Sequence, residues 1–523
     1  MLSDVSVLIV GAGPTGLMLA AELTRRGIAC LVIDAHAAPL HWDRATVVHP
    51  RTLEVFESLG LVEPLLAAGV KQRMARIHSE GSVLGEIDLS ICGSRYGFNI
   101  GVSEEVTESI LTDYLQKLGG EVQRASRLVR LEQQSDCLLA TIECEGTTQH
   151  ISADWVVGCD GIHSTTRQLS GIELVGHDIA EPWAVFDATL TGWADSYEAT
   201  YAYLDAIPVI LTALPRQRWR VYLRPSSPES DLVADAVATI ARYHPTIRFD
   251  DVANPTRFHC HTKVAERFRA GRVLLAGDAA HVCSPAEGHG MNSGLQDALN
   301  LAWKLALVCQ GDAAPALLDS YEAERRPVAE MITASGDAIE HAQTISDPAE
   351  RRARDENLRA VFADPETRHH EAIAEAELNI DYGGSPIVLG DQHEALAPGQ
   401  RLPDTIRVSL AGGDSRLLHE LTHAAGHTAL LIGGPQAGGD QLAQLERALL
   451  AHGGAGLIEG TIVLTACCDA SHPCARLTPE AAERLGVSEV TLLVIRPDGH
   501  VGLRADREHV RAWAAYHARL VGA

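Results

Sequence analysis

Short apolar runs rich in β-branched residues alternate with amphipathic stretches along the first part of the chain. Residues 5–10, Val-Ser-Val-Leu-Ile-Val, predict a buried strand, and residues 17–26 predict a helix that ends at Gly27. Residues 30–33 predict the next strand. A strand, a helix and a second strand in this order predict a parallel βαβ unit, so we expect an α/β fold.

Two later segments have the same pattern of a buried strand that ends in a polar turn. Residues 155–158 run into Asp160-Gly161, and residues 272–276 run into Gly277-Asp278. The second turn leads through a loop containing Pro and Gly to residues 291–308, whose apolar positions share one helical face. We therefore expect a helix there that packs against the core.

The rest of the chain divides into further units. Four strands are predicted between residues 176 and 255, at 183–190, 199–204, 209–214 and 218–223. Charged helical patterns follow, and a third pattern of strands and helices begins near residue 395. The prediction is an α/β domain formed by residues 1–175 and 256–380, an inserted β-sheet domain at 176–255 and a C-terminal domain at 395–523.

Composition and charge limit the possible partners. The 523 residues are enough for about three domains. Lys and Arg number 43 against 69 Asp and Glu, and the net charge of −26 disfavours binding to nucleic acid or to an anionic membrane. No apolar run reaches the roughly 18 residues of a membrane span, and the first residues lack the pattern of a signal peptide. We expect a cytoplasmic protein.

The cysteines give no sign of a metal site or of a disulfide framework. Eleven are scattered along the chain, and no Cys-x-x-Cys pair is present. An odd number in so long a chain is typical of reduced, mostly buried thiols. The prediction is that the protein holds no metal.

The turn after the first predicted strand has the sequence Gly11-Ala-Gly13-Pro14-Thr15-Gly16. In such a turn Gly11 allows the tight bend, Gly13 lets a diphosphate approach the backbone, and Gly16 lets the helix pack on the strand. Asp34 ends the second strand, where its carboxylate would accept hydrogen bonds from a ribose. An acid at this place favours FAD or NAD over NADP as the resident dinucleotide.

Asp278 favours FAD. A carboxylate at the end of a strand, just before the glycine-rich start of a helix, suits a polyol chain that lies over the helix N-terminus. The positive end of that helix would then face the edge of the flavin ring where negative charge develops on reduction.

These motifs together resemble the group A flavoprotein aromatic monooxygenases, the family of p-hydroxybenzoate hydroxylase and phenol hydroxylase. The landmarks of the resemblance occur in family order over residues 1–330: Gly11 to Leu17, Arg44 to Glu54, Asp160-Gly161, Gly277 to His281, Gly288 to Asn292, Leu301 to Leu305 and Tyr321 to Pro327. The resemblance implies a Rossmann-type FAD-binding domain and an inserted β-sheet domain that roofs the substrate pocket.

The resemblance also implies site residues. Those expected to bind the cofactor are Gly11, Gly13, Pro14, Thr15, Gly16, Asp34, Arg44, Glu104, Asp160, Gly161, Asp278, Gly288, Gly290, Met291 and Asn292. Pro285, His289 and Arg44 are the expected catalytic residues. Glu104 and His289 stand where the family pattern has Gln, and Glu287 stands where it has Gly.

The implied reaction is hydroxylation of a phenolic ring by a C4a-hydroperoxyflavin, formed with O2 and with NADH or NADPH as the reductant. The substrate is expected under the inserted sheet, where Tyr203, Arg220 and Tyr222 are candidate contacts for a phenol oxygen or an acidic substituent. The sequence leaves open which phenol is used, which nicotinamide cofactor reduces the flavin, and whether the chain forms a homodimer.

Residues 395–523 resemble the thioredoxin-like C-terminal domain of the larger family members. Without Cys-x-x-Cys this domain cannot perform dithiol chemistry. Three alternative functions stay open: a flavin-dependent halogenase, another FAD oxidoreductase and a non-catalytic flavin-binding scaffold. A halogenase would normally show Trp-x-Trp-x-Ile-Pro, where this chain has Arg218-Trp219-Arg220-Val221.

Overall fold

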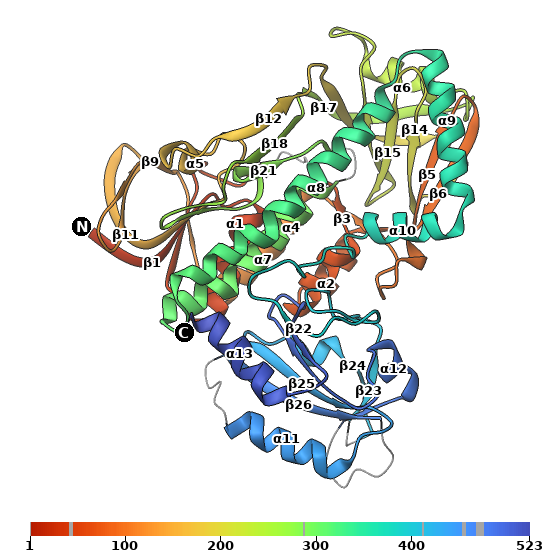
Figure 1. The fold of residues 1–523 in the computed structure, drawn as a ribbon. Coiled ribbons are helices and arrows are strands. Elements are labelled where there is room, and N and C mark those ends of the chain that lie inside the picture. Colours follow the sequence, from red (N-terminus) through yellow and green to blue (C-terminus); the bar gives the residue numbers. More distant parts are fainter. Residues whose placement is uncertain are drawn as a thin grey trace.

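The computed structural model describes residues 2–40, 45–285, 288–410, 413–451, 457–466 and 475–522. Three sheet-containing units make up the molecule (Figure 1). The long helix α8 (Asp319–Thr344) runs diagonally across two of them, and the C-terminal unit, coloured blue, forms the lower lobe (Figure 1).

The first unit is an α/β layer around a sheet of order β19-β20-β11-β1-β2-β8, with β10 and β9 continuing from β11. Strands β20, β11, β1, β2 and β8 pair in parallel, and α1 connects β1 to β2, which confirms the predicted βαβ unit. The strand bounds are β1 Leu2–Val10, β2 Cys30–Ile33, β8 Val122–Gln123, β9 Ser126–Gln133, β10 Leu138–Cys144, β11 Thr147–Gly158, β19 Arg269–Ala270 and β20 Val273–Leu275.

Helices cover this sheet and supply most of its core. Helix α7 packs against α1, and apolar side chains along its length are fully buried. The helices of this unit are α1 Pro14–Arg25, α2 Pro50–Ser58, α3 Val62–Ala68, α4 Glu104–Lys117, α5 Thr165–Leu169 and α7 His289–Gln310. Two small sheets complete it: β3 Val47–Val48 with β7 Asn99–Gly101 and β4 Val70–Gln72, and β12 Leu174–Asp178 with β18 His261–Ala265 and β21 His281–Val282.

The second unit is a sheet of order β17-β13-β16-β15-β14-β5-β6. One face packs against α6 (Leu232–Ile240), and helices α9 (Pro348–Ala363) and α10 (Pro365–Glu375) lie beside its β6 edge. The predicted range 176–255 omits two of its strands, because β5 and β6 come from much earlier in the chain. The strand bounds are β5 Met74–Ser79, β6 Ser82–Asp88, β13 Trp183–Thr191, β14 Ala199–Tyr203, β15 Val209–Leu214, β16 Arg218–Leu223 and β17 Arg248–Phe258.

The C-terminal unit is a mixed sheet of order β22-β29-β28-β25-β26-β27-β23-β24 with helices on both faces. Its thioredoxin-like character stays a prediction. The strand bounds are β22 Leu389–Gly390, β23 Arg407–Ser409, β24 Ser415–Leu417, β25 His427–Gly433, β26 Ile458–Thr465, β27 Ala475–Leu477, β28 Val490–Ile495 and β29 Val501–Ala505. The helices are α11 Gly439–Ala451, α12 Pro479–Arg484 and α13 His509–Val521.

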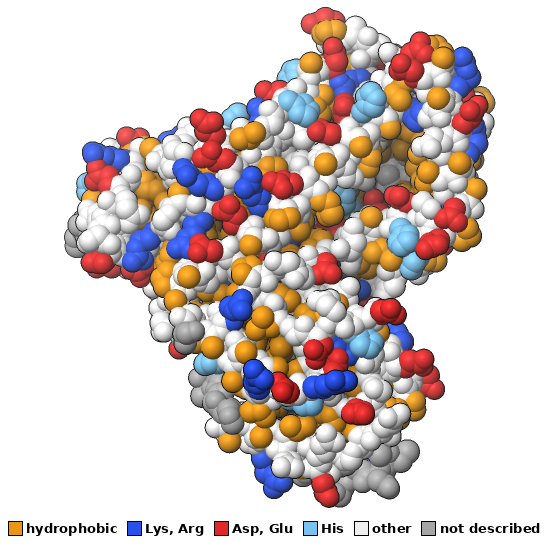
Figure 2. Space-filling model, in the orientation of Figure 1, with side chains coloured by type: hydrophobic (Ala, Val, Ile, Leu, Met, Phe, Trp, Pro, Cys, Tyr) orange, Lys and Arg blue, Asp and Glu red, His pale blue; other side chains and the backbone are white. Residues whose placement is uncertain are grey.

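Lys and Arg side chains are interspersed with Asp and Glu on the face shown in Figure 2 and do not gather into one basic patch. Within the described ranges, the structure contains no helix that is both long and apolar enough to cross a membrane.

A cluster of buried charges joins the C-terminal unit to α7 and α8. Arg496 donates two hydrogen bonds to Glu324, of 2.7 and 2.8 Å, and also pairs with Asp498. Lys304 on α7 reaches the same Glu324 carboxylate at 2.7 Å. Burial alone would raise the pKa of Glu324, but Arg496 and Lys304 outweigh it and hold the pKa at about 2. Two acids and two bases therefore neutralise one another in the interior.

Replacing Arg496 by Met should strongly destabilise the protein, because it leaves the Glu324 and Asp498 carboxylates with one buried cation in place of two. Breaking a buried ion pair by removing one partner costs about 3–5 kcal/mol. Urea unfolding of the Arg496→Met variant measures this loss. Arg511→Met is the matched control, because Arg511 and its partner Glu508 are 82% and 67% exposed. Equal stability of the two variants would contradict a structural role for the cluster.

Candidate active site

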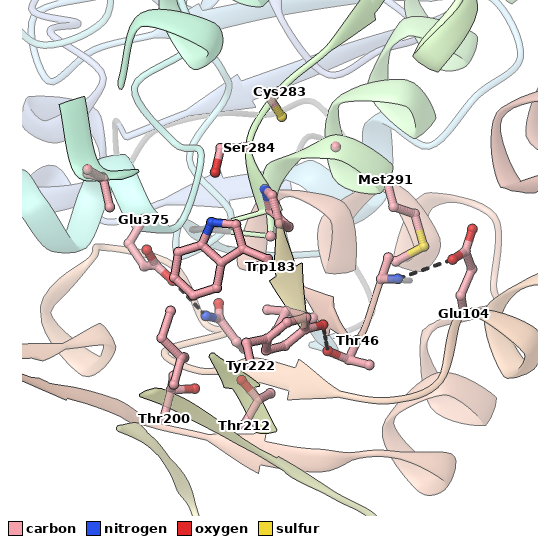
Figure 3. Close-up of a pocket in the computed structure, with 18 of the residues that line it drawn as sticks. Thr46, Glu104, Trp183, Thr200, Thr212, Tyr222, Cys283, Ser284, Met291 and Glu375 are labelled. Carbon is pink, nitrogen blue, oxygen red and sulfur yellow. Dashed lines mark hydrogen bonds between the residues drawn. The ribbon is translucent and has the colours of Figure 1, made fainter. Parts of the chain in front are cut away.

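A cavity of about 600 Å³ lies between the first and second units. It is lined by residues at the N-termini of α1, α4 and α7, by one face of the second sheet, and by residues of α8, α9 and α10. Figure 3 shows part of this lining, with Trp183 and Glu375 pointing into the same space above Thr200 and Thr212.

The turn between β1 and α1 forms one end of the cavity. Gly11 has φ +103°, and a Cβ there would lie 2.3 Å from the carbonyl oxygen of Cys159, so only glycine fits. A Cβ on Gly13 would meet nothing closer than Glu108 Oε1 at 3.8 Å, so the backbone of Gly13 is open to a ligand. Pro14 and Thr15 line the cavity beside it. Helix α1 thus directs its positive end into the cavity.

The start of α7 forms the cavity wall beside this turn. Gly288 caps the helix in the left-handed conformation, with φ 74°. Pro285, Gly290 and Met291 line the cavity around it. Asp278 is exposed between buried neighbours and also lines the cavity. The N-termini of a 12-residue and a 22-residue helix therefore open on one space.

Several predicted cofactor residues do not line the cavity and instead hold its walls. The Asn292 amide donates to the carbonyls of Val47 and Gly288, at 2.9 and 2.8 Å, and its oxygen accepts from the backbone of His49. The contact of Asn292 with a cofactor stays a prediction. Asn292 fixes the loop before α7 against β3.

The carboxylate of Asp160 serves the turn before α5. It accepts hydrogen bonds from Ser164 and from the backbone and side chain of Thr166, at 3.0 and 3.1 Å for the latter two. Gly161, its neighbour, does line the cavity. Only Gly161 of this predicted pair is thus placed to contact a ligand.

Asp34 lies at the end of β2 and accepts from the backbone N–H of Ala12 and of His36, both at 2.8 Å. It does not line the cavity, so its contact with a ribose stays a prediction. Glu104 lines the cavity at the first position of α4 and accepts from the backbone of Ala45 at 3.1 Å. Arg44 and Glu287 lie outside the described residues.

The predicted catalytic residue His289 is turned into the protein. Its side chain is 10% exposed, and Nδ1 lies 2.7 Å from Glu377 Oε1. Its ring also lies against His49, at 5.0 Å between ring centroids. Gly288 and Gly290 line the cavity on either side of His289, but His289 does not. The catalytic role expected for His289 stays a prediction.

Only one of the three predicted substrate contacts lines the cavity. Tyr222 does so and bonds to Thr46 Oγ1 at 3.2 Å (Figure 3). Tyr203 is on the opposite face of β14, where it is fully buried and stacks on His78. Arg220 is 2% exposed and its guanidinium bonds twice to Asp187, at 2.7 and 2.9 Å. Neither Tyr203 nor Arg220 lines the cavity, and their roles as substrate contacts stay predictions.

The described part of the cavity lining contains buried polar atoms that have no hydrogen-bond partner in the protein. These atoms are Trp183 Nε1, Gln343 Oε1 and Ser284 Oγ. A buried polar atom without a partner is costly, so such groups are typical of sites where a ligand completes the hydrogen bonds. Sequence reasoning missed Trp183, Gln343 and the α10 acids Glu371 and Glu375, although the start of a predicted strand at Trp183 was a usable signal.

The residues present fit FAD. An open backbone at Gly13 and a helix N-terminus suit the diphosphate, and the exposed Asp278 suits the hydroxyls of the ribityl chain. The N-terminus of α7 suits the edge of a flavin ring that gains negative charge.

The family model described as an FAD binding domain matches residues 4–335 of the chain. The chain is also 34% identical, over 84% of its length and 87% of the relative, to the 12-dehydrotetracycline 5-monooxygenase/anhydrotetracycline 6-monooxygenase of Streptomyces rimosus. This chain belongs to the FAD-dependent aromatic monooxygenases. The halogenase and scaffold alternatives are therefore set aside.

Further relatives of this monooxygenase agree with the assignment. It is 32% identical to the pentachlorophenol 4-monooxygenase of Sphingobium chlorophenolicum, over 63% of each chain. Its fold matches the structure of aklavinone-11 hydroxylase in complex with FAD and aklavinone, with a TM-score of 0.78, 25% identity and coverage of 100% and 99% of the two chains. NAD(P)H and O2 are the usual co-substrates of such monooxygenases.

Glu108 gives FAD binding by this monooxygenase a predictable pH dependence. Burial, and then the neighbouring Glu104, raise the pKa of Glu108 to about 7. Below that pH the folded protein holds a neutral carboxyl beside Gly13, and above it a carboxylate that repels a diphosphate. The dissociation constant of FAD should therefore rise about three- to tenfold from pH 6 to pH 8.5.

Fluorescence titration of the apoprotein with FAD measures this effect. Glu108→Gln should bind FAD with the same affinity at both pH values, whereas Glu229→Gln, at an exposed loop position, should retain the pH dependence of the wild type. An equal rise of the dissociation constant in Glu108→Gln would show that another group is responsible.

Proposed function

We propose that this monooxygenase hydroxylates a neutral, fused-ring phenol rather than a phenolic acid. The observation that carries the proposal is the chemistry of the cavity wall. None of the described lining residues is Lys, Arg or His. A carboxylate substituent would thus find no cation there, since Arg220 is neutralised by Asp187. Acids on α10 would repel it further.

The apolar surface of the cavity favours an extended ring system. Side chains from several strands and helices form it, and they include Ile77, Ala202, Ile210, Leu358 and Phe362. Trp183 Nε1 and Gln343 Oε1 supply a donor and an acceptor that are otherwise unused. A multi-ring phenol that carries oxygen substituents would accept a hydrogen bond from Trp183 Nε1 and donate one to Gln343 Oε1. The names of two relatives, which contain dehydrotetracycline and aklavinone, point to compounds of this kind.

The chain's own residues have distinct tasks in this reaction. When bound, FAD supplies hydride acceptance from NAD(P)H and activation of O2. Gly13 and the N-terminus of α1 would hold the diphosphate, and Asp278 would hold the ribityl hydroxyls. Pro285 and the first turn of α7 would hold the flavin ring beside the substrate compartment. The apolar wall excludes water, which would otherwise divert the activated oxygen to peroxide.

The nicotinamide cofactor is expected to dock transiently, because the chain has a single Gly-x-Gly-x-x-Gly turn. A cytoplasmic location and a homodimeric assembly stay predictions for this protein.

A panel of matched phenols tests the proposed substrate class. Neutral fused-ring phenols should stimulate NAD(P)H oxidation and yield a product heavier by one oxygen atom, whereas hydroxybenzoates and ring-carboxylated versions of the same fused phenols should do neither. Oxidation of NAD(P)H is followed by absorbance and the product by mass spectrometry. Preferential turnover of the carboxylated members would contradict the proposal.

A further inference from the structure

The carboxylate of Glu375 lies where the substrate compartment meets the start of α7. It ends helix α10, lines the cavity and points into it beside Trp183 (Figure 3). Its side chain is 17% exposed. Asn99 on β7, which also lines the cavity, donates its amide N–H to Glu375 Oε1 at 3.1 Å.

A chain of side chains leads from Glu375 to the loop before α7. His49 Nδ1 lies 3.1 Å from Asn99 Oδ1 and 4.0 Å from Glu375 Oε1. A Cβ on Gly288, the cap of α7, would lie 3.6 Å from His49 Nε2. His49 in turn contacts His289, which is paired with Glu377. Glu375 is therefore held at the end of the substrate compartment that is nearest to the start of α7.

The other described acids of the cavity lie elsewhere. Glu104, Glu105 and Glu108 belong to α4 and lie at the Gly13 end, and Asp278 lines the cavity just after β20. Glu371 is one helical turn before Glu375 and is exposed at the rim. The phenolic hydroxyl of Tyr222 bonds to Thr46.

We propose that Glu375 is a catalytic residue that accepts the proton of the substrate hydroxyl, with Asn99 and His49 as its positioning residues. This inference rests on the proposed function. The O–H bond of the phenol breaks, its electron pair stays on the oxygen, and the proton forms a bond to Glu375. The electron pair that remains enriches the ring carbons ortho and para to the oxygen. One of these carbons bonds to one oxygen atom of the O2 that the reduced cofactor would activate, the O–O bond breaks, and the other oxygen atom leaves as water.

A carboxylate is a sufficient acceptor because the hydroxyl becomes more acidic as the ring gives electrons to the incoming oxygen. The ring oxygen is then a carbonyl, and Glu375 returns the proton to it. The carbon that gained oxygen loses its hydrogen to water as a proton, and the ring becomes aromatic again. No net proton is taken up by the protein.

Glu375→Gln is the decisive variant, since an amide keeps the shape and cannot take a proton. With a phenol that is un-ionised at the assay pH, its single-turnover hydroxylation rate should fall about a hundredfold or more. FAD content and the anaerobic rate of flavin reduction should stay within about twofold of the wild type. With a phenol that is already ionised at the same pH, the difference from the wild type should disappear.

The pH profile separates proton transfer from a structural effect. In the wild type, the rate of hydroxylation should be independent of pH over a range below the pKa of the phenol, where the phenol is un-ionised. In Glu375→Gln the rate should instead rise about tenfold per pH unit up to the pKa of the phenol, because only the phenolate reacts. In Asn99→Leu the fall of the hydroxylation rate at low pH should begin at a higher pH than in the wild type, because the Glu375 carboxylate loses a hydrogen-bond donor.

Glu366→Gln is the matched control, on an exposed position of the same helix, and should behave as the wild type. Equal loss for ionised and un-ionised phenols, or no loss at all in Glu375→Gln, would overturn the proposal and leave the proposed function intact. A wild type that hydroxylates no phenol would overturn both. If Glu375→Gln is isolated without FAD, Glu375→Asp is the variant to measure. Its hydroxylation rate should be lower than that of the wild type but should still be independent of pH over a range below the pKa of the phenol. A rate that depends only on the ionisation of the phenol would overturn the proposal.

Discussion

The burial of helix α7 is the constraint on which the rest of the structure depends. Its N-terminus has to open on the cavity, so its body passes through the interior and carries Asn300 and Lys304 with it. Those polar groups are tolerable only because Glu324 accepts from both of them. Arg496 and Asp498 balance the remaining charge from the C-terminal unit. The C-terminal unit therefore helps to hold α7 in place.

Charge also determines which groups each part of the cavity favours. The helix N-termini at one end favour anionic groups, which suits a diphosphate and a reduced flavin ring. The described wall of the substrate compartment offers no cation, and its acids lie on α10. A negative cofactor and a neutral substrate can therefore share one space without competing for the same residues. Glu375 is at the boundary between the two regions, which is where a proton has to move during hydroxylation.

Features encoded by neighbouring residues could be predicted from the sequence. The turn from Gly11 to Gly16 and the helix after Gly288 depend on local glycine chemistry, and both occur in the structure as expected. Strand alternation places Tyr201 and Tyr203 on one face of β14, but it could not predict that α6 covers that face.

Features made by distant segments could not be predicted. Arg220 is neutralised by its cross-strand neighbour Asp187, a pairing that depends on sheet register. Trp183, Asn99 and Glu375 come from β13, β7 and α10 and meet only in the folded chain. His289 is adjacent in sequence to two cavity residues, yet the partner Glu377 turns its ring away.

Turnover of a neutral fused-ring phenol by the FAD-loaded protein under ¹⁸O₂, with mass analysis of the product, tests most directly whether the chain transfers one oxygen atom from O2 to such a substrate. We expect one ¹⁸O atom in the new hydroxyl group. A product without ¹⁸O, or consumption of NAD(P)H that ends only in hydrogen peroxide, would contradict it.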